Sequence, residues 1–182
     1  MRILALDLSK KSTGWARWGL GEERAVSGTW ELGSEFTSRG KVYLKLHQNM
    51  ADLYSVSPFD AVFFEEAVSP AKLQGQTNAE TIKLAAGLGS HVESFGEAMG
   101  LRIIREVNQA TWRRDFLGKL PRHLRSADLK QMAMDRARQL GFKPQKHDEA
   151  EAIGILDHAC LSLDLTPPWQ LQLALQAQLG GR

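Results

Sequence analysis

Two periods of hydrophobic residues divide the chain into predicted strands and helices. Short runs that are apolar on both faces, or rich in Trp, Val and Thr, predict strands of a buried sheet. These runs cover residues 3–6, 13–19, 24–32, 61–65 and 101–107. Apolar residues three or four positions apart predict helices. The helical segments cover residues 37–54, 78–95 and 108–118, the last with Asn108 as its cap and Gly118 as its stop. Two more helices begin at Ser126, as a cap, and near His147.

The order of these elements predicts an α/β fold. The first three strands form an antiparallel meander, after which helices alternate with strands. We expect a central mixed five-stranded sheet flanked by helices on both faces. Residues 1–165 form one predicted domain, because the length suits a single core and no repeat interrupts it. Residues 166–182 form a tail whose pattern predicts no particular conformation.

Acidic residues stand at the ends of two predicted strands and at the start of a helix. Asp7 and Glu65 end apolar runs, and Asp148 and Glu151 lie three residues apart at the start of the helix near His147. A turn-starting Asp or the helix macrodipole explains each group alone. Four carboxylates gathered in one place, however, require divalent cations to offset their repulsion. Hard oxygen ligands favour Mg²⁺ or Mn²⁺, and two such ions about 4 Å apart suit phosphodiester hydrolysis.

Three further residues, His147, Glu66 and Glu149, stand beside these acids in the sequence. Glu66 follows Glu65, and Glu149 falls on the apolar stripe of its helix. We expect His147 to support the start of the helix or to contact a metal ligand, rather than to bind metal itself. The pattern leaves open whether any of the three joins the metal site.

The acids and their flanks resemble RuvC-type Holliday junction resolvases of the RNase H-like superfamily, in the style of short phage and prophage members. The matching segments are Leu-Ala-Leu-Asp-Leu-Ser at 4–9, Ser-Thr-Gly-Trp-Ala at 12–16, Phe-Phe-Glu-Glu at 63–66 and His-Asp-Glu-Ala-Glu-Ala at 147–152. In that family, an acid ends the first strand, a Glu ends the fourth, and Asp-x-x-Asp opens the last helix. The resemblance therefore implies catalytic and metal-binding roles for Asp7, Glu65, Asp148 and Glu151. Two departures are Asp-Leu-Ser in place of the family's Asp-Pro-Gly, and Glu151 in place of its second Asp.

The resemblance also implies an RNase H-like fold and a function. It implies a homodimer that resolves four-way DNA junctions by symmetric nicking in recombination, repair or phage DNA processing. Two Mg²⁺ ions per site, with Mn²⁺ as a substitute, would support in-line attack by water and leave a 5′-phosphate and a 3′-hydroxyl. Asp7 would bridge both ions.

Basic residues gather between positions 101 and 130, where eight Lys and Arg stand against three Asp and Glu. The net charge of +2 is too small to decide on nucleic-acid binding, so this local excess carries the prediction. A polar loop at 69–78 adds candidates, since the resembling resolvases bring this region towards the junction centre. The predicted DNA contacts are Lys10, Lys11, Lys72, Gln74, Arg113, Arg114, Lys119, Arg122 and Arg125.

Small residues interrupt the helix that starts at residue 78, at Ala85, Ala86, Gly87, Gly89 and Ser90. Glycine inside a helix is unfavourable unless another element approaches closely. That element is either the sheet of the same chain or the same helix of a second copy. The resemblance favours the dimer.

Cysteine content and hydropathy bear on the compartment. The one cysteine, Cys160, cannot form an internal disulfide, which favours a reducing environment. No stretch has the length and hydrophobicity of a membrane span, and the N-terminus shows no signal-peptide pattern. We therefore expect a cytoplasmic protein without a membrane partner.

Three other functions fit parts of the pattern. A broader RNase H-like nuclease would act on forks, flaps or RNA-containing substrates. An actin-like or sugar-kinase ATPase also starts with an Asp-bearing strand, but it needs a second domain that 182 residues do not accommodate. A DNA-binding module without catalysis is disfavoured because all four acids are present.

Overall fold

The structure is a computed structural model that describes residues 1–67, 79–121 and 123–180, without the side chains of 175–180. Lys72, Gln74 and Arg122, three of the predicted DNA contacts, lie outside the described residues.

Five strands form one mixed sheet in the order β3-β2-β1-β4-β5. The strands are β1 (Arg2–Asp7), β2 (Thr13–Gly19), β3 (Val26–Trp30), β4 (Ala61–Glu65) and β5 (Ile103–Val107). β2 is antiparallel to β1 and β3, whereas β4 is parallel to β1 and β5. The strands β1, β3, β4 and β5 therefore run in one direction, and their C-terminal ends share one edge of the sheet. Asp7 and Glu65 stand at that edge.

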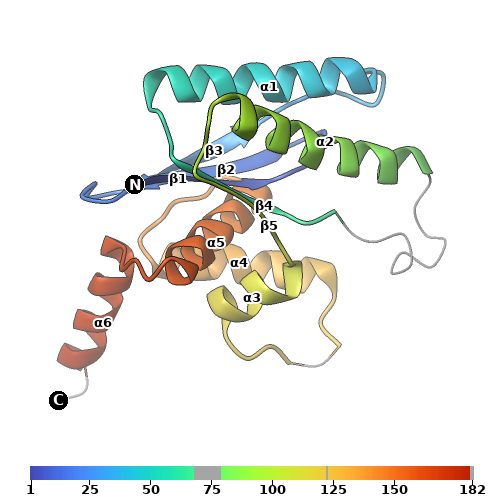
Figure 1. Cartoon of the computed structure of the whole chain (residues 1–182). Helices are drawn as coiled ribbons and strands as arrows, with labels where there is room; N and C mark the ends of the chain where they lie inside the picture. Colours follow the sequence, from blue (N-terminus) through green and yellow to red (C-terminus); the bar gives the residue numbers. More distant parts are fainter. Residues whose placement is uncertain (68–78, 122, 181–182) are drawn as a thin grey trace.

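Helices cover both faces of the sheet (Figure 1). On one face lie α1 (Arg39–Val56) and α2 (Ala79–Ala98), and on the other lie α3 (Gln109–Leu117), α4 (Ser126–Gln139) and α5 (His147–Ser162). The tail contains a further helix, α6 (Pro168–Gly180), which extends away from the sheet. This architecture confirms the predicted α/β fold with a mixed five-stranded sheet.

Several element ends follow from local chemistry. Asn108 caps α3 by accepting a hydrogen bond from the backbone N–H of Ala110 (3.0 Å), and Gly118 ends the helix at φ +76°, both as predicted. Ser126 was predicted as the cap of α4, but it is the first helical residue. The cap is Arg125, because its backbone N–H donates to the Asp128 carboxylate at 3.2 Å.

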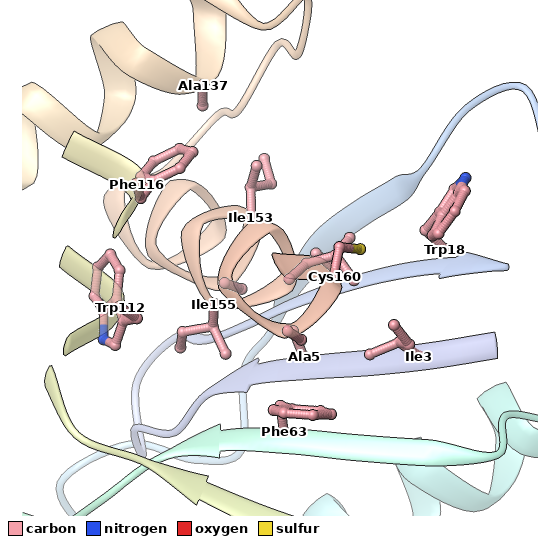
Figure 2. Packing of buried hydrophobic residues seen from close by; sticks show 14 of the residues in the cluster. Ile3, Ala5, Trp18, Phe63, Trp112, Phe116, Ala137, Ile153, Ile155 and Cys160 are labelled. Atoms are coloured by element: carbon pink, nitrogen blue, oxygen red, sulfur yellow. The ribbon is translucent and has the colours of Figure 1, made fainter. Parts of the chain in front are cut away.

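Two hydrophobic cores lie on the two faces of the sheet. Strand β1 sends Ile3 and Ala5 to the face covered by α5, and Leu4 and Leu6 to the face covered by α1 and α2. Figure 2 shows the first of these cores, in which aromatic rings of α3 pack beside α5. Burial of β1 on both faces explains why its sequence is continuously apolar.

Helix α5 is the most enclosed helix of the described chain, with every residue from Glu149 to Asp157 buried. It packs on β1 and β2 and is flanked by α3 and α4. Its first turn lies directly on Gly14 of β2, where a Cβ atom would overlap the backbone carbonyl of Asp148. Gly14 is also the cross-strand partner of Asp7. The glycine therefore lets a helix that carries two acids approach the strand that carries a third.

The small residues of α2 have neighbours within the same chain. A Cβ at Gly87 would overlap the Tyr43 ring of α1, and one at Gly89 would press on Phe64 of β4. Of the two explanations left open by the sequence, approach of the sheet within the same chain accounts for Gly89, whereas Gly87 faces α1, a helix that neither explanation named.

We predict that Gly14→Ala destabilises the protein by more than about 2 kcal/mol, because the added methyl must displace α5 from β2. Gly40, in the first turn of α1, is a matched control because a Cβ there meets no atom within 4 Å. Gly40→Ala should be neutral or stabilising by up to about 1 kcal/mol. Urea unfolding of both variants measures the difference, and equal stability of the two would contradict the close approach.

Candidate active site

Three carboxylates converge at the C-terminal edge of the sheet. Asp7 at the end of β1, and Asp148 and Glu151 in α5, each offer an oxygen, and these oxygens all lie within 4.8 Å of one another. Asp148 and Glu151 share one face of the helix because they are three residues apart. The structure thus brings together three of the four acids that the sequence selected.

The fourth acid, Glu65, stands beside this group on the neighbouring strand β4. Its carboxylate accepts hydrogen bonds from Gln109 Nε2 (2.7 Å) and Trp112 Nε1 (2.9 Å), both on α3. Burial raises the pKa of Glu65, and the charge of Glu151 raises it further, whereas the Trp112 hydrogen bond and the charge of Arg113 oppose the increase. Glu65 is therefore electrostatically part of the group, although α3 fixes its orientation.

The carboxyl group of Asp7 lies at the electrostatic centre of the site. Its pKa is raised well above the usual range, first by desolvation and then by the charges of Glu151, Glu65 and Asp148, with Lys130 acting in the opposite direction. Because three acids repel its ionised form, Asp7 is stabilised either by a proton or by a nearby cation.

Two cationic side chains approach Glu151. Arg113 Nη2 is 2.5 Å from its carboxylate, and Lys130 Nζ lies 3.9 Å from Glu151 and 3.8 Å from Asp148. Arg113 is only 8% exposed, and its guanidinium lies over the Trp112 ring at 5.2 Å. The sequence predicted Arg113 as a phosphate contact, but the structure directs its guanidinium to Glu151 rather than to solvent.

The donor set fits a divalent cation. All four acids offer hard carboxylate oxygens, which suit Mg²⁺ or Mn²⁺. Two cationic side chains, Arg113 and Lys130, face four carboxylates, so an excess of negative charge remains at the site. Bound divalent cations would offset it.

Three residues whose role the sequence left open, Glu66, His147 and Glu149, lie outside the group of three acids found in the described part of the chain. Glu149 is buried on the β3 side, where it accepts hydrogen bonds from Ser27 Oγ (2.7 Å) and the backbone N–H of Gln145 (2.8 Å). Glu66 is exposed and accepts a hydrogen bond from Asn108 Nδ2 at 3.1 Å. His147 is exposed at the start of α5.

The remaining predicted DNA contacts divide into exposed and engaged side chains. Lys11 and Lys119 are exposed, whereas Arg114 and Arg125 are exposed but pair with Asp115 and Asp128. Lys10 is half-buried, and its ammonium donates to the backbone carbonyls of residues 35 and 37.

Sequence reasoning missed Gln109, Trp112 and the role of Lys130. The place of α3 in the chain could have indicated residues near Glu65, because α3 starts directly after β5, and β5 lies beside the strand that carries Glu65. Gln109 and Trp112 are three residues apart and therefore share one helix face.

Comparison with known proteins gives a structural match without a sequence match. No protein-family model and no curated protein matches the sequence. Thermus thermophilus RuvC, in a structure with its Holliday junction substrate, superposes with a TM-score of 0.66 at 16% identity, covering 89% of this chain and 94% of that one. The fowlpox virus Holliday junction resolvase has a TM-score of 0.55 at 13% identity over 90% of this chain and 99% of its own. The yeast mitochondrial resolvase also gives 0.55 at 13% identity, covering 97% and 82%.

These likenesses confirm the expected RuvC-type, RNase H-like fold. None of the described helices has the length and hydropathy that a membrane crossing needs.

We predict that Asp7→Asn stabilises the cation-free protein at neutral pH, because the neutral amide removes the buried charge that the neighbouring acids repel. The folded-state pKa of Asp7 is raised, so its contribution to stability is present when it is protonated and is lost as the pH rises through that pKa. The advantage of the variant should therefore shrink as the pH falls. Added Mg²⁺ should raise the melting temperature of the wild type but not of the variant.

Asp52→Asn, at an exposed position of α1, is the control and should leave both the melting temperature and the Mg²⁺ response unchanged. A wild type and Asp7→Asn variant of equal stability at every pH would argue against the repulsion at Asp7.

We further predict that Trp112→Phe weakens Mn²⁺ binding, because Glu65 loses the indole N–H that orients it. Trp169→Phe is a matched control, since Trp169 also donates to a buried carboxylate, Asp157, at 2.7 Å. Each carboxylate keeps a glutamine donor, Gln109 or Gln170. Both variants should lose about 1–3 kcal/mol of stability in urea unfolding. Only Trp112→Phe should change Mn²⁺ affinity by calorimetry, and an equal affinity of the two would contradict this role.

Proposed function

We propose that this protein is a divalent-cation-dependent endonuclease that resolves four-way DNA junctions by symmetric nicking. The observation that carries the proposal is the convergence of Asp7, Asp148 and Glu151, with Glu65 beside them, at the open edge of a RuvC-like sheet. Solved structures with this fold include three Holliday junction resolvases, one of them in complex with its junction.

Asp7, Glu65, Asp148 and Glu151 are the proposed catalytic and metal-binding residues. They would hold Mg²⁺, with Mn²⁺ as a substitute, and two such ions per site would supply Lewis-acid charge for hydrolysis of the phosphodiester. The residues of the protein keep these ligands in place. Asp7 and Asp148 are fixed by the close packing of α5 on Gly14, which reduces the reorganisation needed when a cation binds.

Helix α3 positions the other two acids. Gln109 and Trp112 donate hydrogen bonds to Glu65, and Arg113 holds Glu151 from the same helix. Glu151 is one methylene longer than the Asp of the resembling family, and its ion pair with Arg113 restricts that extra length. Lys130 faces the same acids and would add positive charge beside a bound phosphate.

Exposed basic residues on two sides of the acids are the proposed backbone contacts. Lys11 lies in the turn after β1, Arg114 lies in α3, and Lys119 and Arg125 lie in the segment between α3 and α4. Such contacts fix the position of the nucleic acid without reading its sequence. Lys72, Gln74 and Arg122 complete the proposed set.

A homodimer would match the symmetry of the substrate. A four-way junction has two strands to cut, and a two-fold dimer presents two equivalent sites. We place this activity in the cytoplasm, in DNA recombination, repair or phage DNA processing.

We predict that the purified protein makes paired, symmetric nicks in a labelled four-way junction with Mg²⁺ or Mn²⁺, leaving 5′-phosphate and 3′-hydroxyl ends. Asp7→Asn should reduce the rate at least about a hundredfold, because it removes the central carboxylate. A fork, a flap and plain duplex are tested in parallel.

Comparable cutting of forks and flaps would indicate a broader branched-DNA nuclease instead of a junction resolvase. An absence of metal-dependent cutting on all four substrates would refute the proposed nuclease activity.

A further inference from the structure

The segment between β3 and α1 emerges beside the acids. Strand β3 runs in the same direction as β1, because each is antiparallel to β2. Residues 31–38 therefore leave the sheet at the edge that carries Asp7 and Glu65. They lie on the side of α1 and α2, opposite the basic residues of α3 and α4.

This segment presents a phenylalanine to solvent. The side chain of Phe36 is 90% exposed, more than any other large hydrophobic side chain described as exposed. A single exposed apolar side chain is ordinary on a protein surface, so the surroundings of this ring decide whether it has a role.

A single lysine fixes the backbone on both sides of Phe36. Lys10 Nζ donates to the carbonyl oxygens of Glu35 (3.3 Å) and Thr37 (2.9 Å). The Lys10 carbonyl accepts hydrogen bonds from the backbone N–H groups of Leu32 and Gly33, both at 3.1 Å. The exposure of the ring is therefore set by contacts with the turn that follows Asp7.

Phe36 borders a groove of about 920 Å³ that runs between this segment, the turn at residues 8–11 and the start of α2. Its wall begins at Leu8, the residue directly after Asp7, and Leu84 and Leu88 of α2 continue it. The groove thus joins the edge where the scissile phosphate must lie if the proposed function holds.

The charges around the groove favour an anionic occupant. Lys10, Lys11 and Arg39 line it against Glu35 and Glu80, and the Glu80 carboxylate is paired with Arg39 at 3.5 Å. The exposed Lys11 is in reach of the groove from the turn after β1. Proteins that bind single-stranded nucleic acid combine basic residues along a groove with aromatic side chains on which bases stack, and Lys11 and Phe36 both line this groove.

We propose that Phe36 is a stacking platform for an unpaired nucleobase of the strand whose phosphate lies at Asp7, with Lys11 on the adjoining backbone. The proposal rests on the proposed function and names a substrate subsite within it. Taking a base out of the stack costs least where it is unpaired, so an open aromatic ring at this position would hold such a base outside the duplex.

The test uses four-way junctions that carry 2-aminopurine at successive positions on each side of the branch point. Wild-type protein, without divalent cations so that no strand is cut, should change the fluorescence at one position. Phe36→Ala should abolish that change and weaken binding about five- to a hundredfold, as expected for loss of one base stack. Phe36→Trp should preserve both.

Val56→Ala is the control, because Val56 is 85% exposed at the far end of α1. It should leave the fluorescence and the affinity unchanged. Circular dichroism and melting curves confirm that all variants are folded.

Unchanged fluorescence and affinity in Phe36→Ala would overturn the stacking role while leaving the nuclease intact. If Phe36→Ala instead alters the sedimentation of the DNA-free protein without changing DNA binding, the groove is a contact between two copies and the proposal is also overturned. A wild type that binds no branched or single-stranded DNA would refute the proposed function itself, which separates the two failures.

Discussion

Repulsion among carboxylates around Asp7 is the constraint on which the rest of the structure depends. Burial raises the pKa of this group, and the charges of three other acids raise it further. Such an arrangement persists only if the surrounding fold holds it in place. The enclosed helix α5, its close approach at Gly14 and the hydrogen bonds from α3 supply that support. The helices α3 and α5 thus hold together, at one edge of the sheet, acids that repel one another.

In helix α3, a neutral and a charged side chain each hold an acid of the candidate site in place. Trp112 donates to Glu65 and also lies under the Arg113 guanidinium, which in turn holds Glu151. Two consecutive residues therefore connect acids from a strand and from a helix. The Arg113 contact also gives a physical role to the longer side chain of Glu151, because an Asp would end one methylene short of its present reach.

The fold and most of the site were predictable because they depend on local patterns. Apolar runs locate the strands, Asn108 and Gly118 delimit α3, and the acids at strand ends identify the edge of the sheet that carries the candidate site. Contacts between distant elements were not predictable. Nothing in the amphipathic pattern of α3 says that Trp112 meets Glu65, and a count of charges cannot show that Arg113 turns inward. The cap of α4 shifted by one residue because Asp128 accepts a backbone hydrogen bond that propensity does not reveal.

The burial of α5 on all sides has a consequence for dynamics. Local opening of a protein begins where few buried contacts resist it, and core elements exchange their amide hydrogens only on global unfolding. Asp148 and Glu151 belong to such a core element, packed between the sheet and two helices. Two of the acids therefore lie in the part of the molecule that is expected to unfold last. Fluctuations in less buried parts of the chain would therefore leave the spacing of these two acids unchanged.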